Sequence, residues 1–202
     1  MHRINCSQCL RPAATCYCHR LRQIDNLWPV TIMQHANERK HVLATARIAA
    51  LSLAHCQLVE GPAGDTQTQL EQDLQAKQPL LVYPAANAVD IAVLAGSEPR
   101  PLLLLDGTWR KTRRMLHESA LLRSLPKVCL PRSERYTSRY RLRKSPRAGY
   151  LSSVETIAYM LGALEQNPAK YQPLLDTQEW LLQQQIKAMG ETTYRRNYRA
   201  QP

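Results

Sequence analysis

The chain has 202 residues, 44% of them hydrophobic and 21% charged, and its 27 Lys and Arg against 16 Asp and Glu give a net charge of +11. This composition excludes a disordered chain, and the length suffices for a buried core. No apolar run approaches the roughly 18 residues of a membrane span, and the first residues lack the apolar segment of a signal peptide. We therefore expect a cytoplasmic protein with no membrane partner.

Four of the six cysteines fall within the first 18 residues: Cys6, Cys9, Cys16 and Cys18. Disulfides are rare in the cytosol, whereas C-x2-C followed closely by C-x-C offers four thiolates with the spacing of a structural zinc site. His19 could replace one of them, and four free thiols are the alternative. We predict a zinc-binding segment over residues 1–22, followed by one domain over residues 23–202. Cys56 and Cys129 have apolar neighbours and are predicted core residues.

Strands and helices are predicted to alternate along the remaining chain. In chain order, the apolar spacing predicts strand 29–35, helix 42–54, strand 55–60, helix 67–77, strand 79–84, helix 89–94, strand 102–105, helix 108–125, strand 127–130, a loop over 132–150, and helices 152–165 and 172–189. The four leucines from Leu102 to Leu105 are continuous, as in a strand buried on both faces. The sequence therefore predicts an α/β fold, with a mainly parallel sheet and helices on both faces.

Positive charge is concentrated in two places. Seven basic residues and one acid lie between residues 132 and 147, with tyrosines among them, and the chain ends in Tyr194-Arg-Arg-Asn-Tyr-Arg199 before its last three residues. Arginine forks suit phosphates, and tyrosines can stack on unpaired bases. A merely solvated basic surface is the alternative. We predict a nucleic-acid partner, with RNA ahead of DNA because no DNA-reading motif is visible.

The predicted strand 102–105 leads directly into Asp106-Gly107-Thr108-Trp109 and a run of basic residues. Ligands of parallel sheets gather at the carboxyl ends of the strands, so this turn is a predicted small-molecule site. Gly107 would allow the backbone to approach a ligand closely. Asp106 and Thr108 could instead cap the following helix, and Trp109 could be a core anchor.

Asp106-Gly-Thr-Trp109 resembles the signature of the DTW-domain family, and further segments match the family's motifs in order. They are the four cysteines, His35-Ala-Asn-Glu38, Thr45-Ala-Arg, Leu81-Val-Tyr-Pro84, Tyr140-Arg-Leu-Arg143 and Leu151-Ser-Ser-Val-Glu155. The resemblance spans residues 6 to about 160. Two positions depart from it: Ala36 replaces a proline and Ala44 an asparagine, which leaves the roles of His35 and Glu38 open.

This resemblance implies a tRNA-uridine aminocarboxypropyltransferase. Such an enzyme transfers the 3-amino-3-carboxypropyl group of S-adenosylmethionine to N3 of a tRNA uridine, here one in the variable loop, and releases 5′-methylthioadenosine. The resemblance also implies a SPOUT-like fold with a C-terminal trefoil knot around the cofactor. Because the basic loops are not an obvious self-interface, we expect a monomer rather than a dimer.

The candidate residues follow from these motifs. Asp106 is the candidate general base, or else a group that orients the cofactor. The predicted cofactor site comprises Tyr83, Pro84, Asp106, Gly107, Thr108, Trp109, Leu130, Pro131, Leu151, Ser152, Ser153 and Glu155. The predicted RNA contacts are Arg110, Lys111, Arg114, Arg135, Arg139, Arg141, Arg143 and Lys144. Ser152-Ser-Val-Glu155 is also a capping box, which needs no functional explanation.

Two other functions fit the same sequence. The first is an S-adenosylmethionine-dependent RNA methyltransferase, which would release S-adenosylhomocysteine instead of methylthioadenosine. The second is a non-catalytic zinc protein that binds RNA, which would bind no cofactor and would keep its RNA affinity without Asp106.

Overall fold

The computed structural model describes residues 5–39, 41, 44–61, 66–131, 133–142 and 150–199. Its centre is a six-stranded sheet in which every pair of neighbouring strands is parallel, in the order β2-β1-β5-β3-β6-β4. The strands are β1 (Val30–Gln34), β2 (Cys56–Glu60), β3 (Leu80–Val82), β4 (Val89–Asp90), β5 (Leu102–Asp106) and β6 (Lys127–Cys129). The predicted parallel α/β fold is confirmed.

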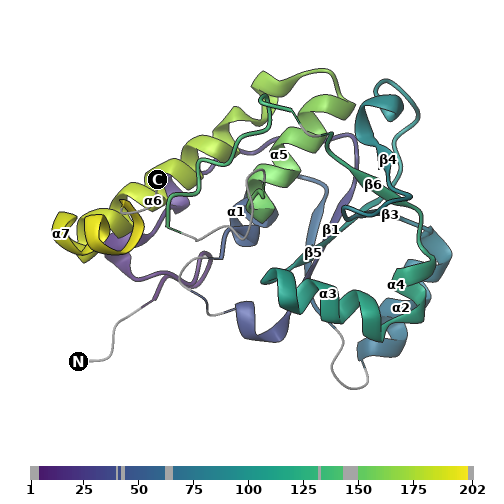
Figure 1. Ribbon diagram of the computed structural model, residues 1–202, viewed down its shortest axis with the longest axis horizontal. Coiled ribbons are helices and arrows are strands. Elements are labelled where there is room, and N and C mark those ends of the chain that lie inside the picture. The colour runs from purple at the N-terminus through teal and green to yellow at the C-terminus, as the bar shows by residue number, and fades with distance from the viewer. Residues whose placement is uncertain are drawn as a thin grey trace.

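Helices cover both faces of this sheet (Figure 1). Leu102 and Leu104 of β5 belong to the core cluster that contains residues of α1 (Ala46–Ser52), α5 (Ser153–Leu164) and α6 (Gln172–Met189). Leu103 and Leu105 belong to the cluster on the other face, which contains residues of α2 (Thr66–Lys77), α3 (Trp109–Glu118) and α4 (Ala120–Ser124). Since successive side chains of a strand point to opposite faces, an unbroken run of leucines is what a doubly covered strand requires.

Two predicted helices were wrong in detail. The helix expected over 108–125 breaks at Ser119, whose backbone is extended and whose Oγ accepts a hydrogen bond from the amide of Leu122, so that α3 ends and α4 begins there. Serine prefers such a cap to a helix interior. The helix expected over 89–94 is instead β4 followed by the short helix η4 (Ile91–Leu94), which Asp90 caps through the amide of Ala92.

The chain continues beyond α6 in two short helical elements. Gly190, with φ of +82°, ends α6 in a left-handed conformation that suits glycine. α7 (Glu191–Tyr194) and the single π-helical turn η6 (Arg195–Arg199) follow. A third hydrophobic cluster joins α7 to residues 133–142, which we call the basic loop, since it combines Tyr140 and Leu142 with Leu182 and Tyr194.

The N-terminal segment packs on the helix layer of α5 and α6. It contains the short helices η1 (Ala13–Thr15) and η2 (Cys18–Arg20). The side chains of Cys9 and Tyr17 are buried in the same cluster as residues of α5 and α6. His19 also lies edge-on against Trp180 of α6, with ring centroids 4.8 Å apart.

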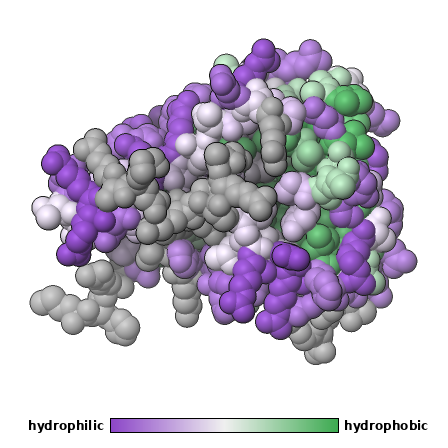
Figure 2. Space-filling view, in the orientation of Figure 1, coloured by the Kyte–Doolittle hydropathy of each residue, from purple (hydrophilic) through white to green (hydrophobic). Residues whose placement is uncertain are grey.

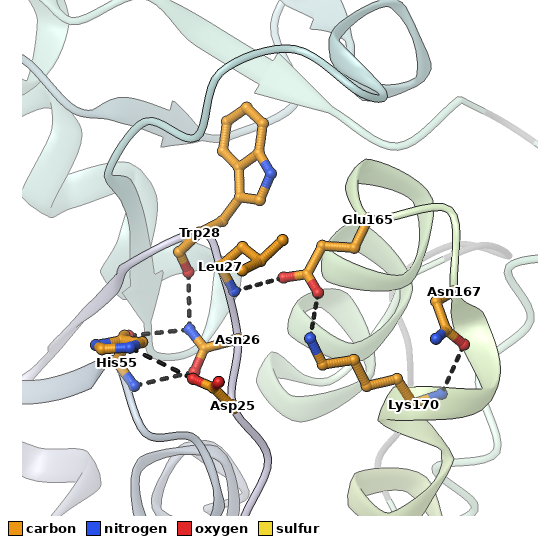
Figure 3. Close-up of polar contacts among 8 residues, drawn as sticks. All are labelled: Asp25, Asn26, Leu27, Trp28, His55, Glu165, Asn167 and Lys170. Atoms are coloured by element: carbon orange, nitrogen blue, oxygen red, sulfur yellow. Dashed lines mark hydrogen bonds and ion pairs between the residues drawn. The ribbon is translucent and has the colours of Figure 1, made fainter.

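A polar cluster fixes the amino edge of the sheet, which lies opposite the carboxyl edge where Asp106 ends β5 (Figure 3). The buried Asn26 donates from Nδ2 to the carbonyls of Trp28 (2.8 Å) and His55 (3.1 Å) and accepts from the amide of His55 (2.9 Å). Glu165, just after α5, accepts from the amide of Leu27 at 2.8 Å and from Nζ of Lys170, in the short helix η5 (Pro168–Tyr171), at 2.6 Å. These bonds tie the chain before β1 to the start of β2 and the end of α5.

Within the described ranges, no helix has both the length and the apolar character needed to cross a bilayer. The trefoil knot implied by the family resemblance stays a prediction, because residues 143–149, between β6 and α5, lie outside the described residues.

Candidate active site

Asp106 is the last residue of β5 and lies at the carboxyl edge of the sheet, where its side chain is buried. The parallel register pairs it with Gln34, the last residue of β1, and Nε2 of Gln34 donates to Oδ2 of Asp106 at 2.7 Å. Ser153, the first residue of α5, donates from Oγ to the other oxygen, Oδ1. The two donors fix the carboxylate between a strand and a helix that are distant in sequence.

The turn after Asp106 places the start of α3 close to the chain that follows β1. Thr108 is the N-cap of α3, and its side chain accepts from the amide of Lys111 at 3.3 Å, so the capping alternative is confirmed for Thr108 and not for Asp106. A Cβ added to Gly107 would lie 3.2 Å from Cβ of Lys111 and 3.6 Å from Cβ of His35. Glycine therefore lets α3 and the His35 turn pack tightly around the site.

Trp109 is half-buried, so the expectation that it could be a core anchor was wrong. Its ring meets that of Tyr150 edge-on, with centroids 4.2 Å apart and planes at 70°. Burial raises the pKa of Tyr83, which follows β3, and the nearby positive charge of Arg113 opposes that rise. Tyr150 also acts electrostatically on Tyr83 and raises its pKa, so three aromatic side chains, Tyr83, Trp109 and Tyr150, gather near the carboxyl edge.

Leu130 and Pro131 follow β6 and are half-buried, whereas Pro84 is exposed. Because β3, β5 and β6 are parallel, the residues after each of them reach the same edge of the sheet. The structure therefore gathers at this edge the predicted cofactor residues from three strands. Their contact with a cofactor stays a prediction.

The α5 N-terminus is held by a complete capping box, as the sequence predicts. Oγ of Ser152 accepts from the amide of Glu155, and Oε2 of Glu155 accepts from the amide of Ser152 at 2.7 Å. The fully buried Glu155 also accepts from the amide of Arg139 (2.6 Å) and from Oγ of Ser138 (3.0 Å). Its carboxylate fastens the basic loop to the helix, so we expect it to shape the site rather than to touch a ligand.

The His35–Glu38 turn is the short helix η3 (Ala36–Glu38), and it supports α3. Nδ1 of His35 accepts from the amide of Asn37 at 3.2 Å, which is a structural cap. Glu38 is buried, and its Oε1 lies 2.7 Å from Nζ of Lys111. Sequence reasoning did not assign Gln34 and Glu38 as partners; the signal for Gln34 was a polar residue at the end of an apolar strand, and the signal for Glu38 was its place in the family motif, with its role left open.

The four N-terminal cysteines form one cluster, with all four Sγ atoms within 4.8 Å of one another. Sγ of Cys6 lies 3.6 Å from that of Cys18, and Sγ of Cys9 lies 3.6 Å from that of Cys16. Tetrahedral zinc with Zn–S bonds of about 2.3 Å needs sulfurs about 3.8 Å apart, so the cluster fits such an ion.

The backbone around the first two cysteines favours thiolate. Hydrogen bonds from the amides of Cys9 and Gln8 lower the pKa of Cys6 to about 6. Burial instead raises the pKa of Cys9 and of Cys18, a cost that binding a cation would offset. Cys56 and Cys129, predicted as core residues, are only half-buried and lie apart from this cluster, and burial raises the pKa of Cys56 to about 12, as for an unreactive thiol.

Arg11 connects the cysteine segment with the active-site side of the molecule. Its guanidinium is buried and donates from Nη2 to the carbonyl of Ala44 at 2.8 Å. The next residue, Thr45, accepts through Oγ1 from the amide of Val154 in the first turn of α5, at 3.5 Å. Burial lowers the pKa of Arg11, and Tyr17 and Tyr140 beside it oppose that change.

Comparison with known protein families matches residues 3–186 to the DTW domain. The chain belongs to the DTW-domain family. It is 32% identical over 181 residues to tRNA-uridine aminocarboxypropyltransferase 2 of Drosophila melanogaster, a match that covers 86% of this chain and 71% of the fly protein. The protein of the same name in Macaca fascicularis is 29% identical, over 82% of this chain and 58% of its own length.

A plant member of the family is more distant. tRNA-uridine aminocarboxypropyltransferase A of Arabidopsis thaliana is 24% identical over 79% of this chain and 72% of its own length. No solved structure matches the chain. Of the segments that suggested the DTW family from sequence, the fold brings the turns of His35 and Ser153 to the Asp106–Gly107 turn, whereas the four cysteines form a separate cluster.

The basic residues predicted as RNA contacts all follow the DTW signature in the chain, on α3 and in the segment after β6. Arg110, Arg114, Arg135, Arg139 and Arg141 are exposed. Arg114 pairs with Glu118 one turn along α3, Arg141 pairs with Glu179 of α6, and Lys111 is the partner of Glu38. Arg143 and Lys144 lie outside the described residues. Contact with RNA stays a prediction for all of them.

Proposed function

We propose that this protein is an enzyme that transfers the 3-amino-3-carboxypropyl group of S-adenosylmethionine to N3 of a uridine in tRNA, with a variable-loop uridine as the acceptor. Membership of the DTW family and the names of its relatives support this reaction. The observation in this chain that carries the proposal is the junction at Asp106, where Gln34 and Ser153 orient one carboxylate at the carboxyl edge of a parallel sheet.

The residues at this edge fit the parts of the donor. Half-buried Leu130, Pro131 and Tyr83 offer an apolar wall for an adenine ring. The α-ammonium group of the donor needs an anion, and Asp106 is the carboxylate at the centre of the site. Its α-carboxylate needs a cation or the amides of a helix N-terminus, and α3 and α5 both begin here. We therefore assign the donor to the space between these two helix starts.

Once bound, S-adenosylmethionine would supply a carbon activated by its sulfonium sulfur. Uridine N3 forms a bond to that carbon, the carbon–sulfur bond breaks with its electron pair remaining on sulfur, and methylthioadenosine leaves. The N3 proton must be removed in the same process, because the protonated nitrogen is a poor nucleophile. Holding the two reactants in line supplies a large part of the rate enhancement in such a transfer.

Asp106 is our candidate for the group that takes or orients the N3 proton. A carboxylate offers about four acceptor positions, and the bonds from Gln34 and Ser153 use one on each oxygen. The two bonds hold the carboxylate in one orientation, which a general base or a positioning group requires.

We assign roles to two further features, the positively charged surface and the cysteine cluster. A net charge of +11, with exposed arginines on α3 and on the loop 133–142, suits the phosphates of tRNA. The four cysteines would hold structural zinc with no open position for catalysis. We expect the enzyme to act in the cytoplasm as a monomer.

The test is to incubate the purified protein with S-adenosylmethionine and total tRNA, and to identify both products by mass spectrometry. A uridine that carries an added aminocarboxypropyl group, together with released methylthioadenosine, is the expected result. A methylated nucleoside together with S-adenosylhomocysteine would replace the proposal with methyl transfer. Tight tRNA binding without either product would point to the non-catalytic RNA-binding protein.

A further inference from the structure

A second basic surface lies at the far end of α6, where α7 and η6 follow. Lys187 of α6 and Arg195 and Arg196 of η6 are exposed there, and we call these three residues the α7 surface. Figure 2 shows mostly hydrophilic side chains at the end of the molecule where Figure 1 places α7. We propose that the α7 surface, together with the basic loop 133–142, binds the tRNA at a distance from the nucleotide that reacts. This inference rests on the proposed function.

The basic loop is fastened to the active site at one of its ends. Glu155 in the first turn of α5 accepts from the amide of Arg139 at 2.6 Å and from Oγ of Ser138 at 3.0 Å. Ser153 lies two residues before Glu155 in α5, and it donates a hydrogen bond to Asp106. An RNA segment in contact with Arg139 would therefore lie near the α5 N-terminus and the proposed reaction centre.

The same loop is fastened to α7 only a few residues later. Tyr140 and Leu142 are buried in a cluster with Leu182 of α6 and Tyr194 of α7. Tyr194 in turn stacks on Tyr198 of η6, with ring centroids 5.9 Å apart and planes at 25°. This small core fixes the basic turn η6 relative to the loop, so the two present their charges as one surface.

Alternation of buried and exposed residues in the loop is consistent with this role. Tyr140 and Leu142 point into the cluster, whereas Arg139 and Arg141 are exposed. The segment thus packs Tyr140 and Leu142 against the cluster and leaves the cations of Arg139 and Arg141 at the surface. These two arginines lie between the active site and the α7 surface.

Acidic residues of this region do not cancel its charge. Arg141 pairs with Glu179, and Arg195 pairs with Glu191 at 2.9 Å, but the arginine side chains are 47% and 64% exposed. Exposed ion pairs contribute little to stability, and a phosphate can take over an arginine fork from a carboxylate. Arg135, Arg139, Arg196 and Lys187 add exposed positive charge. A polyanion is therefore the partner that this surface fits.

The length of the surface excludes a single nucleotide as its partner. Ser152 of the α5 N-terminus donates to Oε1 of Gln178 in α6, at 3.2 Å, so the active site lies beside the middle of that helix. Gln178 and Gly190 are separated by 12 residues, which corresponds to about 18 Å along a helix. Only an RNA that extends well beyond the reacting uridine can contact both ends, which a folded tRNA does.

The test compares tRNA binding by three double variants at several salt concentrations. Arg195→Ala/Arg196→Ala is expected to weaken binding about tenfold and to reduce the slope of log affinity against log salt by about 2, because each lost phosphate contact contributes about 0.9. Arg195→Lys/Arg196→Lys, which keeps the charge, should retain most of the affinity. Arg100→Ala/Arg123→Ala removes the same charge from the amino edge of the sheet, where both arginines are exposed, and should have little effect.

Activity measurements complete the test. The Arg195→Ala/Arg196→Ala variant should raise the KM for tRNA while kcat and the affinity for S-adenosylmethionine stay unchanged, and circular dichroism should show an unchanged fold. If it binds tRNA as tightly as the unchanged protein, or if the Arg100→Ala/Arg123→Ala control loses as much, the α7 surface assignment is wrong and the proposed reaction stands. If the unchanged protein neither binds nor modifies tRNA, the proposed function itself is wrong.

Discussion

Ser153, the first residue of α5, donates a hydrogen bond to the carboxylate of Asp106, the last residue of β5, from 47 positions further along the chain. Gln34 donates to the other oxygen of the same carboxylate at 2.7 Å. Neither contact is needed to build the sheet, because Asp106 also pairs with β1 through its backbone. Their shared effect is to hold one anion in one orientation at the edge where ligands of parallel sheets bind.

We predict that Asp106→Asn reduces kcat/KM for tRNA modification by about 10²- to 10⁴-fold, the contribution of a positioned general base. The amide has the same shape and can still accept from one donor, so the fold should persist. Ser153→Ala removes only an orienting bond and should cost about tenfold. Single-turnover transfer, followed by nucleoside mass spectrometry, measures both. Full activity of the Asp106→Asn variant would remove Asp106 from the chemistry.

The sequence predicted the strands of this site better than it predicted the partners of their side chains. Continuous leucines made β5 recognisable, because a strand covered on both faces has to be apolar throughout. Gln34 and Glu38 were not assigned as partners of Asp106 and Lys111, since a bond between distant segments depends on the register of β1 and β5 and on how α3 is placed. The break at Ser119 was missed for a local reason: apolar spacing continues across it while one side-chain cap ends the helix.

We predict that the purified protein contains about one zinc ion per chain, held by the four cysteines. Cys9→Ser should lose the metal and lower the melting temperature, since a structural zinc site contributes directly to folding. Cys129→Ala is the matched control, because that half-buried thiol lies apart from the cluster, and it should keep the metal. Elemental analysis and thermal melts with and without a chelator test this. Equal metal content in both variants would disprove the site.

The amino edge of the sheet should make an acid-sensitive contribution to stability. The side chain of Glu165 is only 3% exposed. Burial on its own would raise its pKa, but the hydrogen bonds from Lys170 and from the amide of Leu27, together with the charge of Lys170, outweigh burial and lower the pKa below its ordinary value of 4.5. A lowered carboxyl pKa stabilises the fold above that value, and the stabilisation is lost as the pH falls through the folded-state pKa.

We therefore predict that Glu165→Gln lowers the free energy of unfolding by about 1–3 kcal/mol at neutral pH. The difference from the unchanged protein should stay constant down to about pH 5 and shrink in more acid solution, where the carboxylate is protonated. Urea unfolding across this pH range measures it. Glu118→Gln, which affects an exposed pair with Arg114, should show almost no difference at any pH. A pH-independent loss in Glu165→Gln would contradict the ionic explanation.

Two adjacent residues of α3, Arg110 and Lys111, allow RNA contact to be separated from structural support. Lys111 is 28% exposed and lies 2.7 Å from Glu38, which is 6% exposed, whereas Arg110 is exposed. Lys111→Met would leave the Glu38 carboxylate buried without its cation, and we expect a loss of about 1–3 kcal/mol in the free energy of unfolding. Arg110→Met should leave stability within about 0.5 kcal/mol of the unchanged protein and reduce only tRNA affinity.

The double variant Glu38→Gln/Lys111→Met completes a thermodynamic cycle. Removing the charge of Glu38 as well should recover much of the stability lost in Lys111→Met, because the destabilisation comes from an unpaired buried anion. Chemical denaturation gives the coupling energy, and tRNA titration of all four proteins shows whether Lys111 also contacts RNA. Additive losses of stability in the double variant would mean that the ion pair does not support α3. Position 38 would then have to be tested as a ligand contact in its own right.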